Sequence, residues 1–474
     1  MASDNPPNVL WICTDQQRFD TIAAHGFPHV RTPRLDAFAG EGVSFMRAYC
    51  QSPVCTPSRA SFLTGRYPRT TRCRQNGQKI PDYERLLPRT FADRGYVCGL
   101  AGKLHLASCS DGRVEERIDD GYEEFSWSHH PQPDWPENAY TQWLAKQGVS
   151  WEELYAEPGT PYVKAGIPTE YHQTTWAAER TIDFLSRHRD RPWFFSFNCF
   201  DPHHPFDPPQ EYLSQFDPEA MPLPKYRPGE LTNKTEYQRK DSVWAHNEPG
   251  YFDVANMSDR DRREVTAAYA AMVALIDAQF GRILDALEAT GQQDNTIVIF
   301  MSDHGEMLGD HGIYLKGPHF YEEAVRVPLI VRWPGRFSSG SQVSELVELL
   351  DLAPTLCDLA GIGSEPGYQG LSLRPLLEGA PLERPFRQDV FSEYYNAWTH
   401  KRSYGSMLRN EREKMVVYHG AGEGEFYDLE RDPDEFENLW GVLEYRDRQL
   451  ALMNRLFDRS VFSLDPLPIR LGPF

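Results

Sequence analysis

The sequence predicts an α/β protein, in which a large and mostly parallel β-sheet lies between helices and a small antiparallel sheet with a helix follows. Two patterns predict it. Short apolar runs alternate with amphipathic helical stretches along most of the chain, which is typical of a parallel sheet covered on both faces. Beyond about residue 380, short strands separated by turn residues are typical of an antiparallel sheet. We therefore expect a large domain over residues 1–380, which carries the active site, and a C-terminal α+β subdomain over 381–474.

Five apolar runs of four to six residues, mostly β-branched or aromatic, are expected to form buried strands. They are Val9–Cys13, Val97–Leu100, Trp193–Phe197, Thr296–Met301 and Val327–Val331. The clearest helical pattern runs from Arg263 to Glu288, with apolar residues at three-to-four spacing and Gly291 as a stop signal. This alternation predicts the sheet sandwiched by helices.

Residues 126–170 and 202–260 interrupt the alternation, because they are rich in Pro, Trp, Tyr, His and Asp and show little periodicity. Two interpretations stay open: they build the walls of an active-site cleft, or they are surface excursions. The aromatic residues around Trp127–Tyr140 and Tyr226–Tyr251 are candidates for stacking on an aryl, sugar or choline-like group.

The C-terminal pattern predicts four short strands and one helix. The strands are Asp389–Tyr394, Tyr404–Arg409, Lys414–Tyr418 and Glu425–Asp428, and the helix is Leu439–Leu456.

Composition narrows the class of protein. The chain has 474 residues, is 40% hydrophobic and carries a formal net charge of −20, which excludes wholesale disorder and argues against nucleic acid as a partner. The N-terminus lacks the pattern of a signal peptide, and no apolar stretch reaches the ~20 residues needed to cross a bilayer. The eight cysteines show no disulfide or zinc spacing. We expect a soluble, cytoplasmic enzyme with reduced thiols.

Polar side chains follow four of the expected strands, at the point where each strand ends. The runs are Asp15-Gln16, Lys103-Leu104-His105, Asp201-Pro202-His203-His204 and Asp303-His304-Gly305-Glu306. A single Asp in such a place is commonly a helix N-cap. Because the carboxyl ends of parallel strands meet at one edge of a sheet, the four runs together predict one shared site there.

A basic segment points to an anionic substrate. From Arg47 to Lys103 there are eleven Lys and Arg residues against three acids, a local charge of +8, so the remainder of the chain carries −28. Such a segment concentrates small anions, although many of these side chains are also expected to pair with the acidic surface.

Within this segment lies Cys55-Thr56-Pro57-Ser58-Arg59, followed by Ala60-Ser61-Phe62-Leu63-Thr64-Gly65-Arg66. The run resembles the signature of the type I sulfatases of the alkaline phosphatase superfamily, in which the cysteine of C-x-P-S-R is oxidised to formylglycine. The plain alternative is an inert buried cysteine beside an N-capping Ser58. The resemblance extends from Asn8 to Pro433 and implies an alkaline-phosphatase-like sandwich with a smaller C-terminal sheet. A hydrated aldehyde also suits the chemistry, since one hydroxyl attacks sulfur and the other later expels sulfate.

The resemblance implies one divalent metal ion held by Asp15, Asp303 and the modified Cys55, with Gln16 and His304 at the remaining ligand positions. Many sulfatases have Asp and Asn at the last two positions. Oxygen ligands suit Ca²⁺, Mg²⁺ or Mn²⁺, whereas an imidazole favours Mn²⁺ or Zn²⁺. We therefore expect Ca²⁺ or Mn²⁺ first, and Mg²⁺ or Zn²⁺ as alternatives.

The resemblance also implies roles for the remaining candidate residues. Arg59 is expected to hold the formylglycine hydrate, and Lys103 and Lys316 to bind the sulfate oxygens. His105 is expected to act as a base, and His203 as the acid that protonates the leaving group, with His204 as the alternative. The implied partners are a small sulfate ester and a formylglycine-generating enzyme during maturation, with neither nucleic acid nor membrane; a homo-oligomer is left open.

Three functions compete at this point. The principal hypothesis is metal-dependent hydrolysis of sulfate monoesters. The nearest rival is a phosphonate monoester or phosphodiester hydrolase of the same superfamily, because members of that group resemble this chain at Asp15-Gln16 and Asp303-His304, whereas Lys316 favours a sulfatase. The third is a non-catalytic protein that binds sulfated ligands, which the full set of catalytic residues disfavours.

Overall fold

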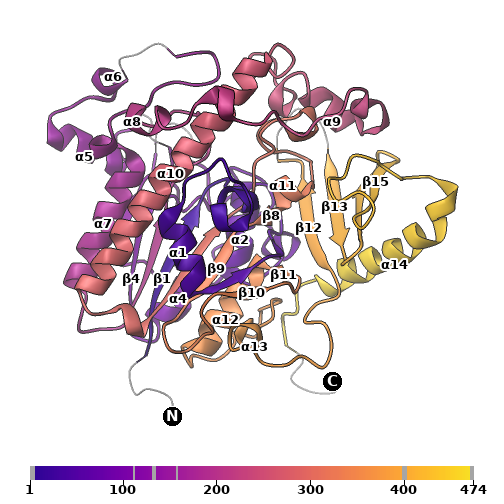
Figure 1. The fold of residues 1–474 in the computed structure, drawn as a ribbon. Helices are drawn as coiled ribbons and strands as arrows, with labels where there is room; N and C mark the ends of the chain where they lie inside the picture. Colours follow the sequence, from indigo (N-terminus) through magenta and orange to yellow (C-terminus); the bar gives the residue numbers. More distant parts are fainter. Residues whose placement is uncertain (1–5, 110–112, 131–134, 156–158, 398–402, 470–474) are drawn as a thin grey trace.

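The computed structural model describes residues 6–109, 113–130, 135–155, 159–397 and 403–469. Figure 1 shows a layered body of sheet and helices, with a smaller sheet and one long helix at the C-terminal side. The strands are β1 Asn8–Thr14, β2 Val43–Phe45, β3 Ala48–Tyr49, β4 Val97–Gly102, β5 Glu124–Trp127, β6 Trp193–Asn198, β7 Thr296–Ser302, β8 Arg326–Val327, β9 Leu329–Arg332, β10 Ser341–Val343, β11 Val347–Glu348, β12 Val390–Tyr395, β13 Tyr404–Arg409, β14 Glu413–Tyr418 and β15 Glu423–Asp428.

The helices of more than one short 3-10 turn alternate with these strands. They are α1 Pro33–Glu41, α2 Cys55–Thr64, α3 Pro68–Thr71, α4 Leu87–Ala92, α5 Ala139–Gln147, α6 Trp151–Leu154, α7 Gln173–Arg187, α8 Gln210–Leu213, α9 Glu236–Asp241, α10 Asp259–Ala289, α11 Glu322–Val325, α12 Leu352–Leu359, α13 Arg374–Leu377 and α14 Arg446–Phe462.

The main sheet has eight strands in the order β10-β2-β9-β7-β1-β6-β4-β5. Strand β1 is central and pairs in parallel with β6 and β7, and β4 and β5 continue the parallel pairing. Strand β9 is antiparallel to both of its neighbours, β7 and β2. The mixed, mostly parallel sheet predicted from the sequence is confirmed.

Helices cover both faces of this sheet, so its central strands are buried on both sides. In β1, Leu10 and Ile12 pack in the core formed with α1, α7 and α10, whereas Val9 and Trp11 pack in the core formed with α2, α4 and α12. All seven residues of β1 are buried. This explains why the strands appear in the sequence as continuous apolar runs rather than as alternating ones.

Helix α10 carries most of the contact between the sheet and the insertions. It begins at a capping box formed by Ser258 and Asp261, and Gly291 follows its end with a left-handed φ of 70°. By length and composition it is the one helix among the described residues that passes as a candidate membrane span, but 83% of the relevant window is buried inside the protein. That burial is what a core helix requires.

One predicted strand is divided in the structure. The run Val327–Val331 forms the end of β8 and most of β9, with Pro328 between them. Proline has no N–H to donate to a sheet ladder, so the chain leaves the small sheet β11-β3-β8 there and enters the main sheet.

The C-terminal sheet β12-β13-β14-β15 is antiparallel throughout, as predicted. The predicted helix Leu439–Leu456 is wrong at its start, because α14 begins at Arg446. Gly441 has a left-handed φ of 76°, and the N–H of Leu439 donates to the carbonyl of Phe426 on β15, so this segment is held as a turn against the sheet. The boundary at residue 380 stays a prediction.

The two insertions lie at the upper end of the molecule in Figure 1, where α5, α6, α8 and α9 are found above the sheet. Strand β1 starts near the N-terminus at the lower end, so the insertions surround the carboxyl ends of the parallel strands. Parts of both insertions therefore border the edge where the predicted site lies, while other parts are surface.

Candidate active site

Cys55 lies at the start of α2, and the local sequence explains why the helix begins there. Val54 is extended, Pro57 falls in the first turn where its missing N–H costs no hydrogen bond, and Gly65 ends the helix in a left-handed conformation. The N–H of Thr56 donates to Oδ1 of Asn76, 3.0 Å away. The Cys55 side chain is thus fixed at a helix N-terminus, where the helix dipole favours a negatively charged group.

The Cys55 sulfur is surrounded by charged side chains from three other segments. Its Sγ lies 3.1 Å from Nε2 of His304, 3.2 Å from Nζ of Lys316 and 3.6 Å from Oδ1 of Asp15. Cys55 is only 1% exposed. The sulfur therefore marks the centre of the candidate site.

Two buried carboxylates, Asp15 and Asp303, follow the adjacent strands β1 and β7. Arg59 joins them, because its Nε donates to Asp303 at 2.8 Å and its Nη2 to Asp15 at 3.3 Å. Nζ of Lys103 donates to the same Asp15 carboxylate at 2.5 Å. The cations balance the two carboxylates in a water-poor interior.

The arrangement fits a divalent metal ion. One ligand atom each from Asp15, Cys55, Asp303 and His304 lies within 4.8 Å of all the others, and all four residues are buried. Nδ1 of His304 faces the carbonyl oxygen of Gly305 at 2.9 Å, so that nitrogen is the donor and Nε2 carries the lone pair. Two carboxylates, an imidazole and the substituent of residue 55 are suitable donors for such an ion.

Gln16 is held in one orientation by its neighbours. Its backbone is left-handed, with φ 68°, its Nε2 donates to Glu306, and its Oε1 accepts from Nζ of Lys316 at 2.5 Å. The amide oxygen therefore faces the cluster. Glu306 was quoted within the strand-end run but received no role from the sequence.

His105 lies beside this cluster on the loop after β4. Its backbone N–H donates to the buried Glu115 at 2.7 Å, its ring meets that of His129 edge to face at 4.3 Å, and its Nδ1 has no hydrogen-bond partner. Burial, and then the charge of Lys103, lower the pKa of His105 well below its usual value. The ring is neutral at pH 7 and can accept a proton.

His203 and His204 stack on each other at 4.1 Å after β6, but they have different partners. Nδ1 of His203 lies 2.5 Å from the carbonyl oxygen of His204, whereas Nε2 of His204 lies 2.5 Å from the hydroxyl of Tyr251. Burial, followed by the charge of Lys316, lowers the pKa of both imidazoles well below the usual value. Both rings therefore lie within the electrostatic reach of the site.

The charges of the site keep the sulfur and Asp15 ionised. Burial and Asp15 raise the pKa of the Cys55 thiol, but Lys103, Lys316 and His304 lower it further, so the net pKa is below the ordinary value. Burial raises the pKa of Asp15, but Lys103 and Arg59 more than offset that and hold it well below the usual range. An anion brought to this site meets three cations, Arg59, Lys103 and Lys316.

The structure thus brings eight of the sequence-predicted site residues into direct contact with one another: Asp15, Gln16, Cys55, Arg59, Lys103, Asp303, His304 and Lys316. His105, His203 and His204 border them. Asp201, which shares a strand-end run with the histidines, faces away, since its carboxylate accepts from Thr174 on α7 at 2.7 Å.

Several supporting residues carried no signal in the sequence. Asn76, Glu115 and Tyr251 contact the site from segments far along the chain, and only their positions in space reveal them. The repeated His, Trp and Tyr residues of the insertions were the nearest available hint for Tyr251 and for His129.

Comparison with known proteins adds the following. A family model described as Sulfatase matches residues 7–362, and one described as N-sulphoglucosamine sulphohydrolase, C-terminal, matches residues 309–461. An arylsulfatase of Clostridium perfringens is 30% identical over 477 residues, which cover 93% of this chain and 92% of that protein.

Two solved structures are also similar along nearly the whole length. A phosphonate monoester hydrolase from Silicibacter pomeroyi has a TM-score of 0.86 at 25% identity, with 97% of this chain and 96% of that chain covered. A phosphonate monoester hydrolase of Agrobacterium radiobacter has a TM-score of 0.85 at 27% identity, with 98% of both chains covered. The alkaline-phosphatase-like fold expected from the sequence is confirmed by these neighbours.

Proposed function

The chain belongs to the sulfatase family and is a sulfuric ester hydrolase, and from that premise we propose that it hydrolyses sulfate monoesters with a formylglycine made from Cys55 and with one bound divalent metal ion. The observation that carries this proposal is the position of Cys55. It begins a buried helix inside the signature Cys55-Thr56-Pro57-Ser58-Arg59, and its sulfur lies within 3.6 Å of His304, Lys316 and Asp15.

A hydrated formylglycine supplies two hydroxyl groups on one carbon, of which one attacks sulfur and the other expels sulfate as the aldehyde forms again. Cys55 is only 1% exposed in the folded chain. A formylglycine-generating enzyme therefore needs to reach the segment before it is buried, and maturation by such an enzyme is part of the proposal.

Asp15, Gln16, Asp303 and His304, together with residue 55, would hold the metal ion. The ion would supply positive charge to polarise the sulfate oxygens and the attacking hydroxyl. The buried oxygen and nitrogen donors support a divalent ion, with Ca²⁺ or Mn²⁺ as the first candidates.

The side chains of the protein perform the remaining tasks. Lys103 and Lys316 are proposed to bind the sulfate oxygens, and Arg59 to hold the hydrated side chain of residue 55 beside both carboxylates. His105, with an unpaired Nδ1, is proposed as the base that removes the hydroxyl proton when sulfate is expelled. His203 is proposed to protonate the departing alcohol oxygen.

A second candidate function is hydrolysis of phosphonate monoesters or phosphodiesters. Gln16 and His304 favour it, since both differ from the Asp and Asn of many sulfatases, and the two phosphonate monoester hydrolases above are similar in fold. Lys316, which lies 3.2 Å from the nucleophile position, favours the sulfatase.

One experiment separates these functions. Purified protein is first examined by mass spectrometry, where the peptide containing a formylglycine at position 55 is about 18 Da lighter than its cysteine form. The same preparation then hydrolyses a sulfate monoester, a phosphate diester and a phosphonate monoester side by side. We expect the largest kcat/KM for the sulfate ester. Full activity with only unmodified Cys55, or a preference for the phosphonate, would contradict the proposal.

A further inference from the structure

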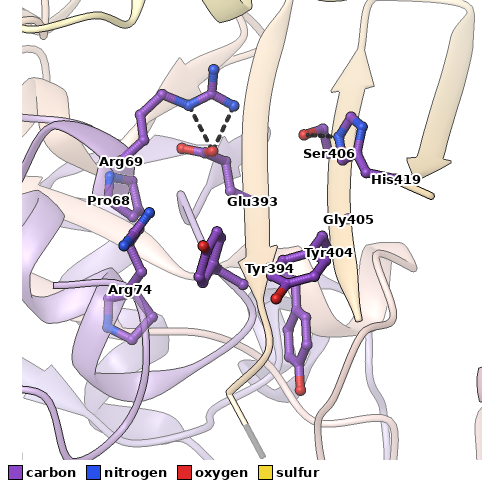
Figure 2. Close-up of a pocket in the computed structure, with 11 residues that line it drawn as sticks. Pro68, Arg69, Arg74, Glu393, Tyr394, Tyr404, Gly405, Ser406 and His419 are labelled. Carbon is purple, nitrogen blue, oxygen red and sulfur yellow. Dashed lines mark hydrogen bonds and ion pairs between the residues drawn. The ribbon is translucent and has the colours of Figure 1, made fainter. Parts of the chain in front are cut away.

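A cavity of about 490 Å³ lies between the segment that carries the nucleophile and the C-terminal sheet. Figure 2 shows its walls: Pro68, Arg69 and Arg74 line one side, and Tyr404, Ser406 and His419 line the other, across β12. Its volume falls within the range of ordinary ligand pockets. None of these residues belongs to the catalytic cluster described above.

The two arginines of this cavity differ in how their charges are balanced. Arg69 forms an ion pair of 2.6 Å with Glu393 and also donates to the carbonyl of Ser460. Arg74 has no carboxylate within ion-pair distance among the described residues, and its buried Nε has no hydrogen-bond partner. A buried guanidinium nitrogen without an acceptor is costly, so an acceptor from a ligand would be favourable.

Aromatic rings surround this free charge. The guanidinium carbon of Arg74 lies 4.0 Å from the ring centre of Tyr395, and the ring of Tyr395 meets that of Tyr404 at 4.7 Å. On the opposite wall, His419 is bonded to Ser406 at 2.8 Å, and burial followed by the charge of Arg69 lowers the pKa of His419. At neutral pH the cavity thus offers one unbalanced positive charge and flat apolar faces.

The cavity lies close to the reacting centre. Pro57, which is two residues beyond Cys55, contributes to its wall. The loop that carries Arg74 contacts both sides, because Asn76 accepts from Thr56 at 3.0 Å and Gln75 donates to the carbonyl of Asn396 at the end of β12. A ligand held by Arg74 would therefore lie beside the helix that presents residue 55.

We propose that this cavity is a second anion-binding site, which takes a carboxylate or sulfonate attached to a ring, with Arg74 pairing with the anion and Tyr395 and Tyr404 flanking the ring. The anion comes either from the substrate, as a second charged group, or from a separate small molecule. Only the first source rests on the proposed sulfate hydrolysis.

The test begins with binding, which needs no turnover. Benzoate is titrated calorimetrically into the wild-type protein, into Arg74→Gln, and into Arg72→Gln as the matched control. Arg72 is exposed, lies in the same segment and does not line the cavity. We expect the Kd for benzoate to rise at least tenfold in Arg74→Gln, to stay within twofold in Arg72→Gln, and to recover in part in Arg74→Lys. Thermal melting curves show whether each variant is folded.

Kinetics then identify the source of the anion. KM is compared for 4-nitrophenyl sulfate and for the same ester with a ring carboxylate. A ratio of the two KM values that rises at least tenfold in Arg74→Gln alone supports a second charged group on the substrate. An unchanged ratio with lost benzoate binding supports a separate anion. The proposal is overturned if wild-type protein does not bind benzoate, or if Arg74→Gln and Arg72→Gln bind it equally. Absence of any esterase activity would count against the proposed function and leave the binding result to stand by itself.

Discussion

Nε2 of His304 lies 3.1 Å from Sγ of Cys55, while Nδ1 of the same ring donates to the carbonyl of Gly305. The backbone thus fixes which nitrogen faces the nucleophile position and the two carboxylates. An imidazole at a metal site favours Mn²⁺ or Zn²⁺ over Ca²⁺, because Ca²⁺ prefers oxygen donors. The choice of ion is therefore expected to depend on His304.

Replacing this imidazole by an amide should change the preference for the metal. In His304→Asn, we expect the Kd for Zn²⁺ and Mn²⁺ to rise tenfold or more, with a smaller change for Ca²⁺. Calorimetric titration of the chelator-treated protein measures each Kd. His319→Asn is the control, since His319 is also buried but pairs with Asp241 outside the site. Equal losses for all three ions would show that His304 does not select the metal.

Glu306 is expected to orient Gln16, although it lies outside the ligand set. One oxygen of Glu306 accepts from Nε2 of Gln16, and the other accepts from the N–H groups of Leu308 and Leu315. Glu306→Gln would place an NH₂ group against Gln16 and turn its amide, so that its oxygen no longer faces the cluster. We expect the Kd for the metal to rise at least tenfold, as measured by calorimetry. Unchanged affinity would remove Gln16 from the ligand set, and Glu323→Gln is the control.

The stability of the protein should depend on pH through Asp277, which joins α10 to the start of α1. Its carboxylate accepts from the N–H groups of Leu35 at 2.7 Å and Arg34 at 3.2 Å, and burial raises the pKa of Asp277 to about 6. The folded state then holds a proton that the unfolded state releases near pH 4, so the free energy of unfolding falls as pH rises from about 4 to about 6. The loss is on the order of 2–3 kcal/mol.

Asp277→Asn should flatten this dependence. Thermal unfolding of the wild type and the variant at pH 4.5, 5.5 and 7 measures it, and the wild type should lose more stability over that range. Asp285→Asn, on the same helix but exposed, is the matched control. Parallel curves for the wild type and Asp277→Asn would show that Asp277 is ionised throughout.

The sequence predicts the sheet and the catalytic cluster for the same physical reason. Strands buried on both faces must be apolar throughout, so Val9–Cys13 and Thr296–Met301 stand out, and the residues that follow them must meet at one sheet edge. Asp15 and Asp303 could therefore be placed side by side without coordinates. The Cys55 motif then indicated the chemistry.

Other features depend on contacts that no local pattern records. Tyr251 reaches His204 only because the insertion folds back over the sheet, and Asn76 caps α2 through a loop with no periodicity. The start of α14 was misplaced because the apolar spacing continues through Leu439, while the turn at Gly441 is set by packing against β15. Helical spacing alone does not distinguish a helix from a turn held by its neighbours.

The contacts of His203 and His204 also differ in a way that bears on their roles. Nδ1 of His203 is bonded to a carbonyl, which leaves its Nε2 available, whereas Nε2 of His204 is already bonded to Tyr251. His203 is thus the better placed of the two to exchange a proton with the substrate. His105, whose Nδ1 is unpaired, lies on the loop after β4 next to Lys103.

The last prediction separates His203 from His105 by the step that each serves. Protonation of the leaving oxygen matters most for a poor leaving group, because an alkoxide must be neutralised as it forms. His203→Ala should therefore reduce kcat/KM for an alkyl sulfate at least a hundredfold more than for 4-nitrophenyl sulfate, and His204→Ala should not. His105→Ala should slow both esters to a similar limit and leave an initial burst of alcohol or phenol, because expulsion of sulfate does not involve the leaving group. Steady-state and stopped-flow assays with both esters measure these effects. Equal losses for both esters in His203→Ala, with no burst in His105→Ala, would show that the two roles are assigned to the wrong residues.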